Sequence, residues 1–194
     1  MAEREDEDDG KADSVRARYE AHGADAYYRE HAEGYVNPHE PEIGQASEMA
    51  VSRWELDFSH VLDLAAGSGE ATLALRGLGA GKIDGCDPYL FAQYERRTGK
   101  PAERFSFEDV AAGALAGRAC SLIVCSFALH LAAPSRLPGV CQQLSVIAPA
   151  LLILTPHKRP ELQEAWGWTL QGEFVWARVR CRFYRSVTET PVRT

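Results

Sequence analysis

Short apolar runs alternate with longer amphipathic stretches from His60 onward, and this alternation predicts the architecture of the chain. Strands are expected at 60–65, 81–86, 103–107, 120–127 and 149–155, and helices at 70–77, 89–97, 134–147 and 160–167. Strands that alternate with helices are typical of a parallel sheet with helices on both faces. We therefore expect a doubly wound α/β core.

The end of the chain has a different period. Apolar side chains recur at every second position between Val175 and Tyr184, which predicts a half-buried strand, with Arg178, Arg180 and Arg182 on its polar side. About one turn separates this segment from Trp168–Glu173, so we expect an antiparallel C-terminal hairpin in a mostly parallel seven-stranded sheet. The arginine row could follow phosphates, but a solvated strand face is the more common origin of such a row.

Residues 14–55 are predicted to form a helical cap or lid ahead of a Rossmann-like core over 56–194, within a single domain of residues 14–194. The segment Tyr35-Val-Asn-Pro-His-Glu-Pro interrupts the helical pattern. Pro38 and Pro41 disfavour helix immediately before them, and Pro41 suits the first turn of a new helix that continues to Trp54. Two helical pieces joined by a bent connector are therefore expected.

Charge is spread unevenly along the 194 residues. The net charge is −7, and residues 3–13 hold seven acidic residues against Arg4 and Lys11, which leaves −2 for the rest. A segment so poor in apolar residues is expected to be a disordered acidic tail, over residues 1–13. The longest strongly apolar run, at 147–154, is too short to span a bilayer, and the five cysteines form no C-x-x-C pair. We expect a cytoplasmic protein with no membrane partner.

The most informative motif joins the first predicted strand to the helix that follows it. The strand ends in Gly67-Ser68-Gly69, where glycines allow a sharp turn and let a ligand approach the amides of a helix N-terminus. A Gly-x-Gly alone also fits an ordinary strand-to-helix turn. Thr72 occupies the third small position of a dinucleotide fingerprint, and Asp63 inside the strand would repel a diphosphate. These two residues disfavour NAD and favour a ligand with ammonium or hydroxyl groups.

A second acidic residue ends the next predicted strand. Asp87 lies 20 positions after Gly67, where a carboxylate can accept hydrogen bonds from both hydroxyl groups of a ribose. The pattern implies a ligand with a free ribose diol.

Asp63-Leu-Ala-Ala-Gly-Ser-Gly and Asp87 together resemble the first motif and the ribose-binding acid of class I S-adenosylmethionine-dependent methyltransferases. The similarity covers roughly residues 60–185, and Ser121 to His130 resembles the fourth strand, which reaches the methyl-transfer site. It implies S-adenosyl-L-methionine (SAM) as the cofactor, with Glu108 and Asp109 at the adenine-contacting position. The cofactor-binding residues that the resemblance implies are Asp63, Ala65, Gly67, Ser68, Gly69, Asp87, Pro88, Tyr89, Glu108, Asp109, Ser126 and Phe127.

The chain departs from the family at the end of this fourth strand. It reads Ser126-Phe-Ala-Leu-His130 and lacks the Asn/Asp-Pro-Pro-Tyr sequence with which relatives hold the amino group of a base or a glutamine. DNA is therefore not an expected substrate. Cys120 stands where relatives often carry aspartate, and we interpret this change as structural.

His130 is the candidate catalytic residue, because a histidine at this strand end could remove a proton from an acceptor hydroxyl group. A packing or hydrogen-bonding role is the more common one for such a histidine. His157, followed by Lys158 and Arg159, could hold an anionic substrate or belong to a solvated turn. The candidate substrate-binding residues are Tyr27, Tyr28, Tyr35, Asn37, His39 and His157, and those in the cap could equally serve packing. The histidines and cysteines show no zinc-ligand spacing, so no metal is expected.

The sequence thus predicts a SAM-dependent methyltransferase that acts on oxygen or nitrogen of a small molecule. Methylation of RNA or protein is an alternative that the C-terminal arginines suggest and the acidic balance opposes. A non-catalytic SAM-binding regulatory module is a second alternative.

Overall fold

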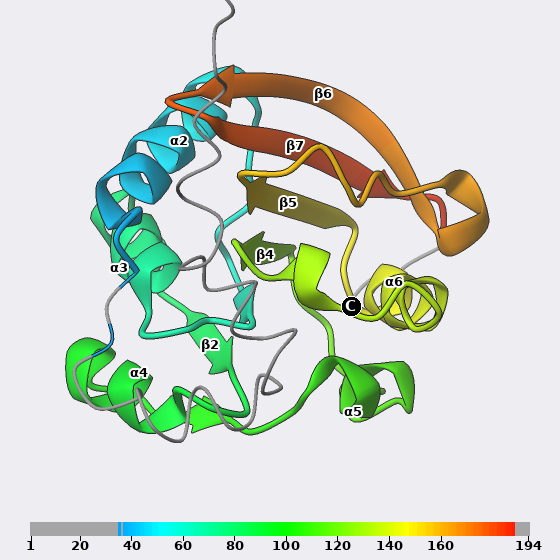
Figure 1. Cartoon of the computed structure of the whole chain (residues 1–194), viewed down its shortest axis with the longest axis horizontal. Helices are drawn as coiled ribbons and strands as arrows, with labels where there is room; N and C mark the ends of the chain where they lie inside the picture. The colour runs from blue at the N-terminus through cyan, green and yellow to red at the C-terminus, as the bar shows by residue number, and fades with distance from the viewer. Residues whose placement is uncertain (1–34, 36, 189–194) are drawn as a thin grey trace, which may run out of the picture.

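The structure is a computed structural model that describes Tyr35 and residues 37–188. One seven-stranded sheet has the order β3-β2-β1-β4-β5-β7-β6 (Figure 1). The strands are β1 (Val61–Leu64), β2 (Ile83–Cys86), β3 (Ala102–Glu103), β4 (Leu122–Ser126), β5 (Ala150–Thr155), β6 (Trp168–Trp176) and β7 (Val179–Ser186). The helices are α2 (Glu40–Arg53), α3 (Glu70–Gly77), α4 (Phe91–Thr98), α5 (Phe107–Ala111) and α6 (Leu137–Ile147), with 3-10 turns η1 (Leu129–Leu131) and η2 (Glu164–Trp166). The predicted tail and the first helical piece lie outside the described residues.

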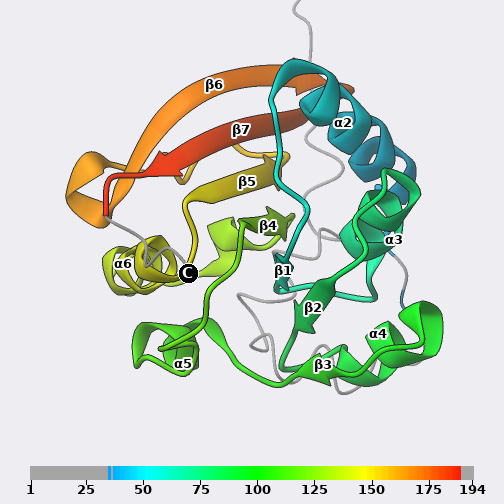
Figure 2. The ribbon, with the colours of Figure 1, turned by 180° about the vertical axis from the view of Figure 1, so that it is seen from behind.

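Helices cover both faces of the sheet. Helices α2, α3 and α4 lie on one side and α5 and α6 on the other (Figures 1 and 2). Successive side chains of a strand point to opposite faces, and β4 shows this directly: Leu122 and Val124 pack in one core cluster, Ile123 and Cys125 in the other. Strands β1 to β5 pair in parallel, whereas β7 pairs antiparallel with both β5 and β6. The predicted doubly wound sheet with an antiparallel hairpin is confirmed.

Helix α2 begins at the prolines as the sequence predicts. Pro41 occupies the first turn, and the helix ends at Arg53, before the extended Trp54. Its apolar face buries Ile43, Ala46 and Ala50 in the cluster shared with α3. The Trp54 ring then stacks on Phe183, at 5.3 Å between ring centroids, which fixes the end of α2 against the hairpin.

Two predicted elements differ in the structure. The helix expected at 160–167 is wrong, because only a 3-10 turn forms at Glu164–Trp166. The Arg182 guanidinium donates hydrogen bonds to the carbonyl oxygens of Lys158, at 2.9 Å, and Pro160, at 2.7 Å, so these oxygens bond to a side chain rather than to helical amides. The third strand is shorter than predicted and is followed by α5, which Ser106 begins through a capping box with Asp109.

The hairpin turns inside the segment predicted as its second strand. Ala177 and Arg178 both have positive φ angles, 45° and 67°, so the chain reverses without the glycine or asparagine that usually signals such a turn. The expectation that the arginine row lies on a solvated strand face is wrong for Arg182. Arg182 is 4% exposed and pairs with Glu173, because β7 lies between β5 and β6 rather than at an edge.

Candidate functional site

A cavity of about 220 Å³ lies at the carboxyl ends of the parallel strands. It sits beside the neighbouring strands β1 and β4, from which the sheet is wound in opposite directions, the usual ligand position in such folds. The predicted site residues that line it are Tyr35, Ala65, Gly67, Asp87, Pro88, Tyr89, Glu108, Ser126 and Phe127. The sequence therefore identified a large part of the cavity wall, from five separate segments.

The backbone is strained at two points of this wall. Ala65 follows β1 with a φ of 52°, and Phe127 follows β4 with a φ of 55°. A left-handed conformation costs a non-glycine residue about 1–3 kcal/mol, so neighbouring contacts must impose it. The amide of Phe127 donates to the carbonyl oxygen of Leu154 at 2.7 Å, and that of Ala66 to Cys86 at 3.0 Å. Strain of this kind is typical of ligand-binding sites.

Asp87 lines the cavity and also organises the backbone around it. Its Oδ2 accepts the Gly67 amide at 2.9 Å, and its Oδ1 accepts the amides of Tyr89, at 2.8 Å, and Leu90, at 2.7 Å. Burial raises the pKa of Asp87 above its usual value, and these amide hydrogen bonds oppose the rise. A carboxylate offers about four acceptor positions, so about one position is left for a ligand hydroxyl group rather than the two that the sequence suggested.

The two glycines of the loop have different roles. Gly67 has a φ of 58°, and a Cβ atom there would lie 3.3 Å from Glu70 Oε2. Gly69 has a φ of 93°, and a Cβ atom there would lie 2.5 Å from Thr98 Cγ2. The close approach at Gly69 is therefore made by α4, whereas Gly67 lines the cavity.

Asp63 is fully buried beneath the loop. Its Oδ2 accepts the Thr72 hydroxyl at 2.6 Å, and Thr72 in turn lies 3.0 Å from the Tyr94 hydroxyl. Oδ1 is buried and has no hydrogen-bond partner among the described residues. Burial raises the pKa of Asp63 to about 7, and the nearby carboxylates of Glu70 and Asp87 add to the rise.

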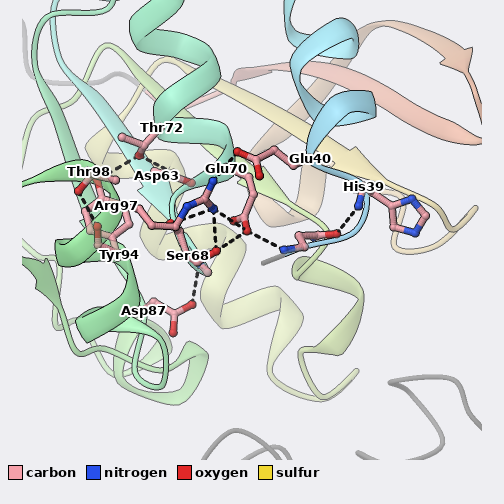
Figure 3. A network of polar contacts seen from close by, with 12 residues as sticks. His39, Glu40, Asp63, Ser68, Glu70, Thr72, Asp87, Tyr94, Arg97 and Thr98 are labelled. Carbon is pink, nitrogen blue, oxygen red and sulfur yellow. Dashed lines mark hydrogen bonds and ion pairs between the residues drawn. The ribbon is translucent and has the colours of Figure 1, made fainter. Parts of the chain in front are cut away.

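A polar network that the sequence did not reveal surrounds the loop (Figure 3). The Glu70 carboxylate is 4% exposed. It accepts hydrogen bonds from the backbone amide of Asn37 at 2.8 Å, from the Ser68 hydroxyl, and from the Arg97 guanidinium at 3.2 Å. Arg97 also contacts Glu40 at 2.5 Å. Arg97 follows Gly67 by 30 positions and no motif contains it, so local patterns carried no signal for this contact.

Aromatic contacts dominate the other side of the cavity. The His39 ring stacks on Phe127 at 5.1 Å between centroids, and the His130 ring lies 4.3 Å from that of His157. Leu131, next to His130, lines the cavity and is 40% exposed. The predicted residues His39, His130 and His157 are not among those that line the cavity; His39 contacts the wall through Phe127, and His130 is adjacent to Leu131.

The remaining predicted residues take other positions. Asp109 caps α5 through Ser106 and does not line the cavity. Ser68 and Gly69 lie behind the wall, and Asn37 faces Glu70. Tyr27 and Tyr28 lie outside the described residues.

One curated relative establishes the family of this chain. The uncharacterized protein C17A5.05c of Schizosaccharomyces pombe is 31% identical over an alignment of 229 positions, and the match covers 89% of this chain and 92% of the relative. The chain belongs to the family of this protein. No protein-family model matches the sequence.

Solved structures establish the fold. Magnesium protoporphyrin IX methyltransferase from Synechocystis PCC 6803 with bound SAM has a TM-score of 0.57 and 18% identity, and the match covers 89% of this chain and 95% of that one. The DhpI–SAH complex has a TM-score of 0.62 and 19% identity, and the match covers 83% and 94%. The chain has the class I methyltransferase fold.

Two further features of the fold concern other kinds of site. Across Tyr35 and residues 37–188, no three metal-ligating side chains come together. In the same part of the chain, no helix has both the length and the apolar character needed to cross a membrane.

Proposed function

We propose that this protein is a SAM-dependent methyltransferase that acts on oxygen or nitrogen of a small molecule. The observation that carries the proposal is the cavity at the ends of β1, β2 and β4, where Gly67 and Asp87 meet in one wall. The class I methyltransferase fold and the SAM and SAH bound in the solved relatives support it.

The residues present suit the proposed cofactor. SAM carries a sulfonium and an ammonium group, and the loop is surrounded by the buried carboxylates of Asp63, Glu70 and Asp87. Asp63 Oδ1 has no hydrogen-bond partner among the described residues, as expected where a ligand or water completes a site. Asp87 would accept one ribose hydroxyl group, and the wall with the rings of Tyr89 and Phe105 and the acidic Glu108 would hold the adenine. Bound SAM would supply an electrophilic methyl group.

The acceptor would lie toward Phe127 and His130. Phe127, Leu131 and Tyr35 form an apolar wall there, which favours a small molecule with an apolar body over a nucleic acid. His130 would take the proton that the acceptor oxygen or nitrogen releases, with His157 against its ring. Catalysis would otherwise rest on positioning the acceptor.

We also propose a cytoplasmic location. All five cysteines are buried thiols, as in proteins of reducing compartments. Burial raises the pKa of the Cys86 thiol to about 12, which makes that thiol unreactive.

The test is calorimetry of the whole chain with SAM, SAH and NAD. We expect binding of SAM and SAH and none of NAD, with loss of binding in Asp87→Ala. Binding of NAD without either sulfur nucleoside would refute the proposal. Release of SAH from SAM in the presence of small-molecule acceptors then tests the transferase activity, and a protein that binds SAM but never releases SAH would be a regulatory module instead.

A further inference from the structure

Arg97 joins parts of the molecule that are far apart in the sequence. Its Nη1 donates to the Ser68 hydroxyl at 2.9 Å and to Glu70 at 3.2 Å, and its Nη2 donates to Glu40 at 2.5 Å. One guanidinium group on α4 thus contacts the glycine loop, the start of α3 and the start of α2 (Figure 3). We refer to Arg97, Glu70, Glu40 and Ser68 as the Arg97 clasp.

The clasp holds the connector, which comprises Tyr35 and residues 37–39. Glu70 accepts the Asn37 amide at 2.8 Å, and the Asn37 side chain accepts the His39 amide at 2.9 Å. The His39 ring then stacks on Phe127. Each end of the connector therefore reaches the cavity wall, through Tyr35 at one end and through the ring stacked on Phe127 at the other.

A molecule in the cavity would contact both the connector and the glycine loop. Tyr35 lines the same cavity as Gly67 and Asp87. Glu70 holds the two segments together, because its buried carboxylate bonds to Asn37 on one side and to Ser68 on the other. A carboxylate with 4% exposure needs its cationic partner, which here is Arg97.

We propose that Glu70 and Arg97 are positioning residues that couple the connector to the glycine loop, residues 67–69. Occupation of the cavity and closure of the connector over it then favour each other, and each must do so to the same extent. The inference deepens the proposed function, since the ligand in question is SAM or SAH. Through the clasp, cofactor binding would order the connector, which forms part of the wall against which the methyl acceptor then lies.

The planar fork of arginine is what the clasp requires. Acceptors on three segments surround one guanidinium group. A lysine carries the same charge but presents it as a single point, so it cannot span these acceptors. Arg97→Lys should therefore restore only part of the coupling, whereas a purely electrostatic role would be restored in full.

The test compares Arg97→Met with Arg96→Met in the full chain. Arg96 lies next to Arg97 on α4 but donates to Gln93 within the same helix, which makes it a matched control. Hydrogen exchange of the peptide covering 37–43 is followed with and without SAH, and SAH affinity is measured by calorimetry. In Arg97→Met we expect the amide hydrogens of this peptide to exchange faster and SAH no longer to slow their exchange. The variant should also bind SAH about tenfold more weakly. Arg96→Met should match the unmodified chain.

The outcomes distinguish coupling of the connector to SAH binding from a contribution of Arg97 to stability alone. A structural role lowers the melting temperature but leaves the SAH-induced protection of residues 37–43 intact, and that result would overturn the inference. Glu70→Gln is an independent test, because it keeps the side-chain shape and removes the charge. It should also weaken the protection of residues 37–43 by SAH. Failure of the unmodified chain to bind SAH would refute the proposed cofactor, while the exchange comparison without SAH would still decide whether Arg97 holds the connector.

Discussion

The two halves of the cavity are built by different forces. In the cofactor half, at the ends of β1 and β2, polar groups are tied to one another: Asp87 accepts three backbone amides and Glu70 bridges three segments. In the half proposed to hold the acceptor, called the acceptor half, rings lie against rings: His39 stacks on Phe127, which lines the cavity, and His130 lies beside His157 behind this wall.

The difference predicts which half of the cavity tolerates substitution. When one member of a buried hydrogen-bond network is removed, its partner is left unsatisfied, and this lowers the free energy of unfolding by the partner's full desolvation penalty. Ring contacts depend on area and offset, and they tolerate substitution at smaller cost. We therefore expect substitutions in the cofactor half to alter stability and cofactor affinity together, and substitutions in the acceptor half to leave both nearly unchanged.

The largest effect is expected from Asp63→Asn, which removes the buried acid of the cofactor half. The pKa of Asp63 is raised from 3.8 to about 7, so the folded protein keeps a proton that the unfolded chain has lost between these pH values. This contribution to stability is complete below about pH 4 and is lost as the pH rises to about 7, a change of about 4 kcal/mol. Urea unfolding from pH 4 to 8 should show Asp63→Asn gaining on the unmodified chain as the pH rises.

The outcome that would contradict this prediction is a constant difference between the two chains. A constant difference would mean that Asp63 is ionised throughout, and that its environment is more polar than the buried site suggests. Cationic SAM should reduce the pH dependence of the unmodified chain, because it favours the ionised carboxylate.

The next effect sharpens the contrast within the cofactor half. Gly69→Ala places a Cβ atom 2.5 Å from Thr98 and keeps a positive φ, so it should lower the free energy of unfolding by about 3 kcal/mol. Gly67→Ala meets the conformational cost, about 1 kcal/mol, and a milder contact, 3.3 Å from Glu70 Oε2, so its loss should be the smaller one. Denaturant unfolding of both variants measures the ratio, and equal losses would show that α4 yields at Thr98.

The sequence predicted that Asp63, the glycine loop and Asp87 lie close together, because its signals for them are local. Asp63, the glycine loop and Asp87 fall at strand ends whose positions follow from apolar runs. The Arg97 clasp could not be predicted, since it joins residues up to 57 positions apart that no periodic pattern relates. The turn at Ala177 and Arg178 was missed for another reason: packing imposes positive φ angles on residues that carry no turn signal.

The smallest effect is expected from His130→Ala in the acceptor half. The variant removes a ring that lies against His157 and outside the Arg97 clasp, so the free energy of unfolding should change by less than about 1 kcal/mol. The affinity for SAH should stay within about twofold of the unmodified chain, a change of roughly 0.4 kcal/mol. His157→Ala, which removes the other ring of the pair, is the matched control in denaturant unfolding and calorimetry. A tenfold loss of SAH affinity in His130→Ala would break the comparison, because the two halves would then share one network and His130 would belong to the cofactor half.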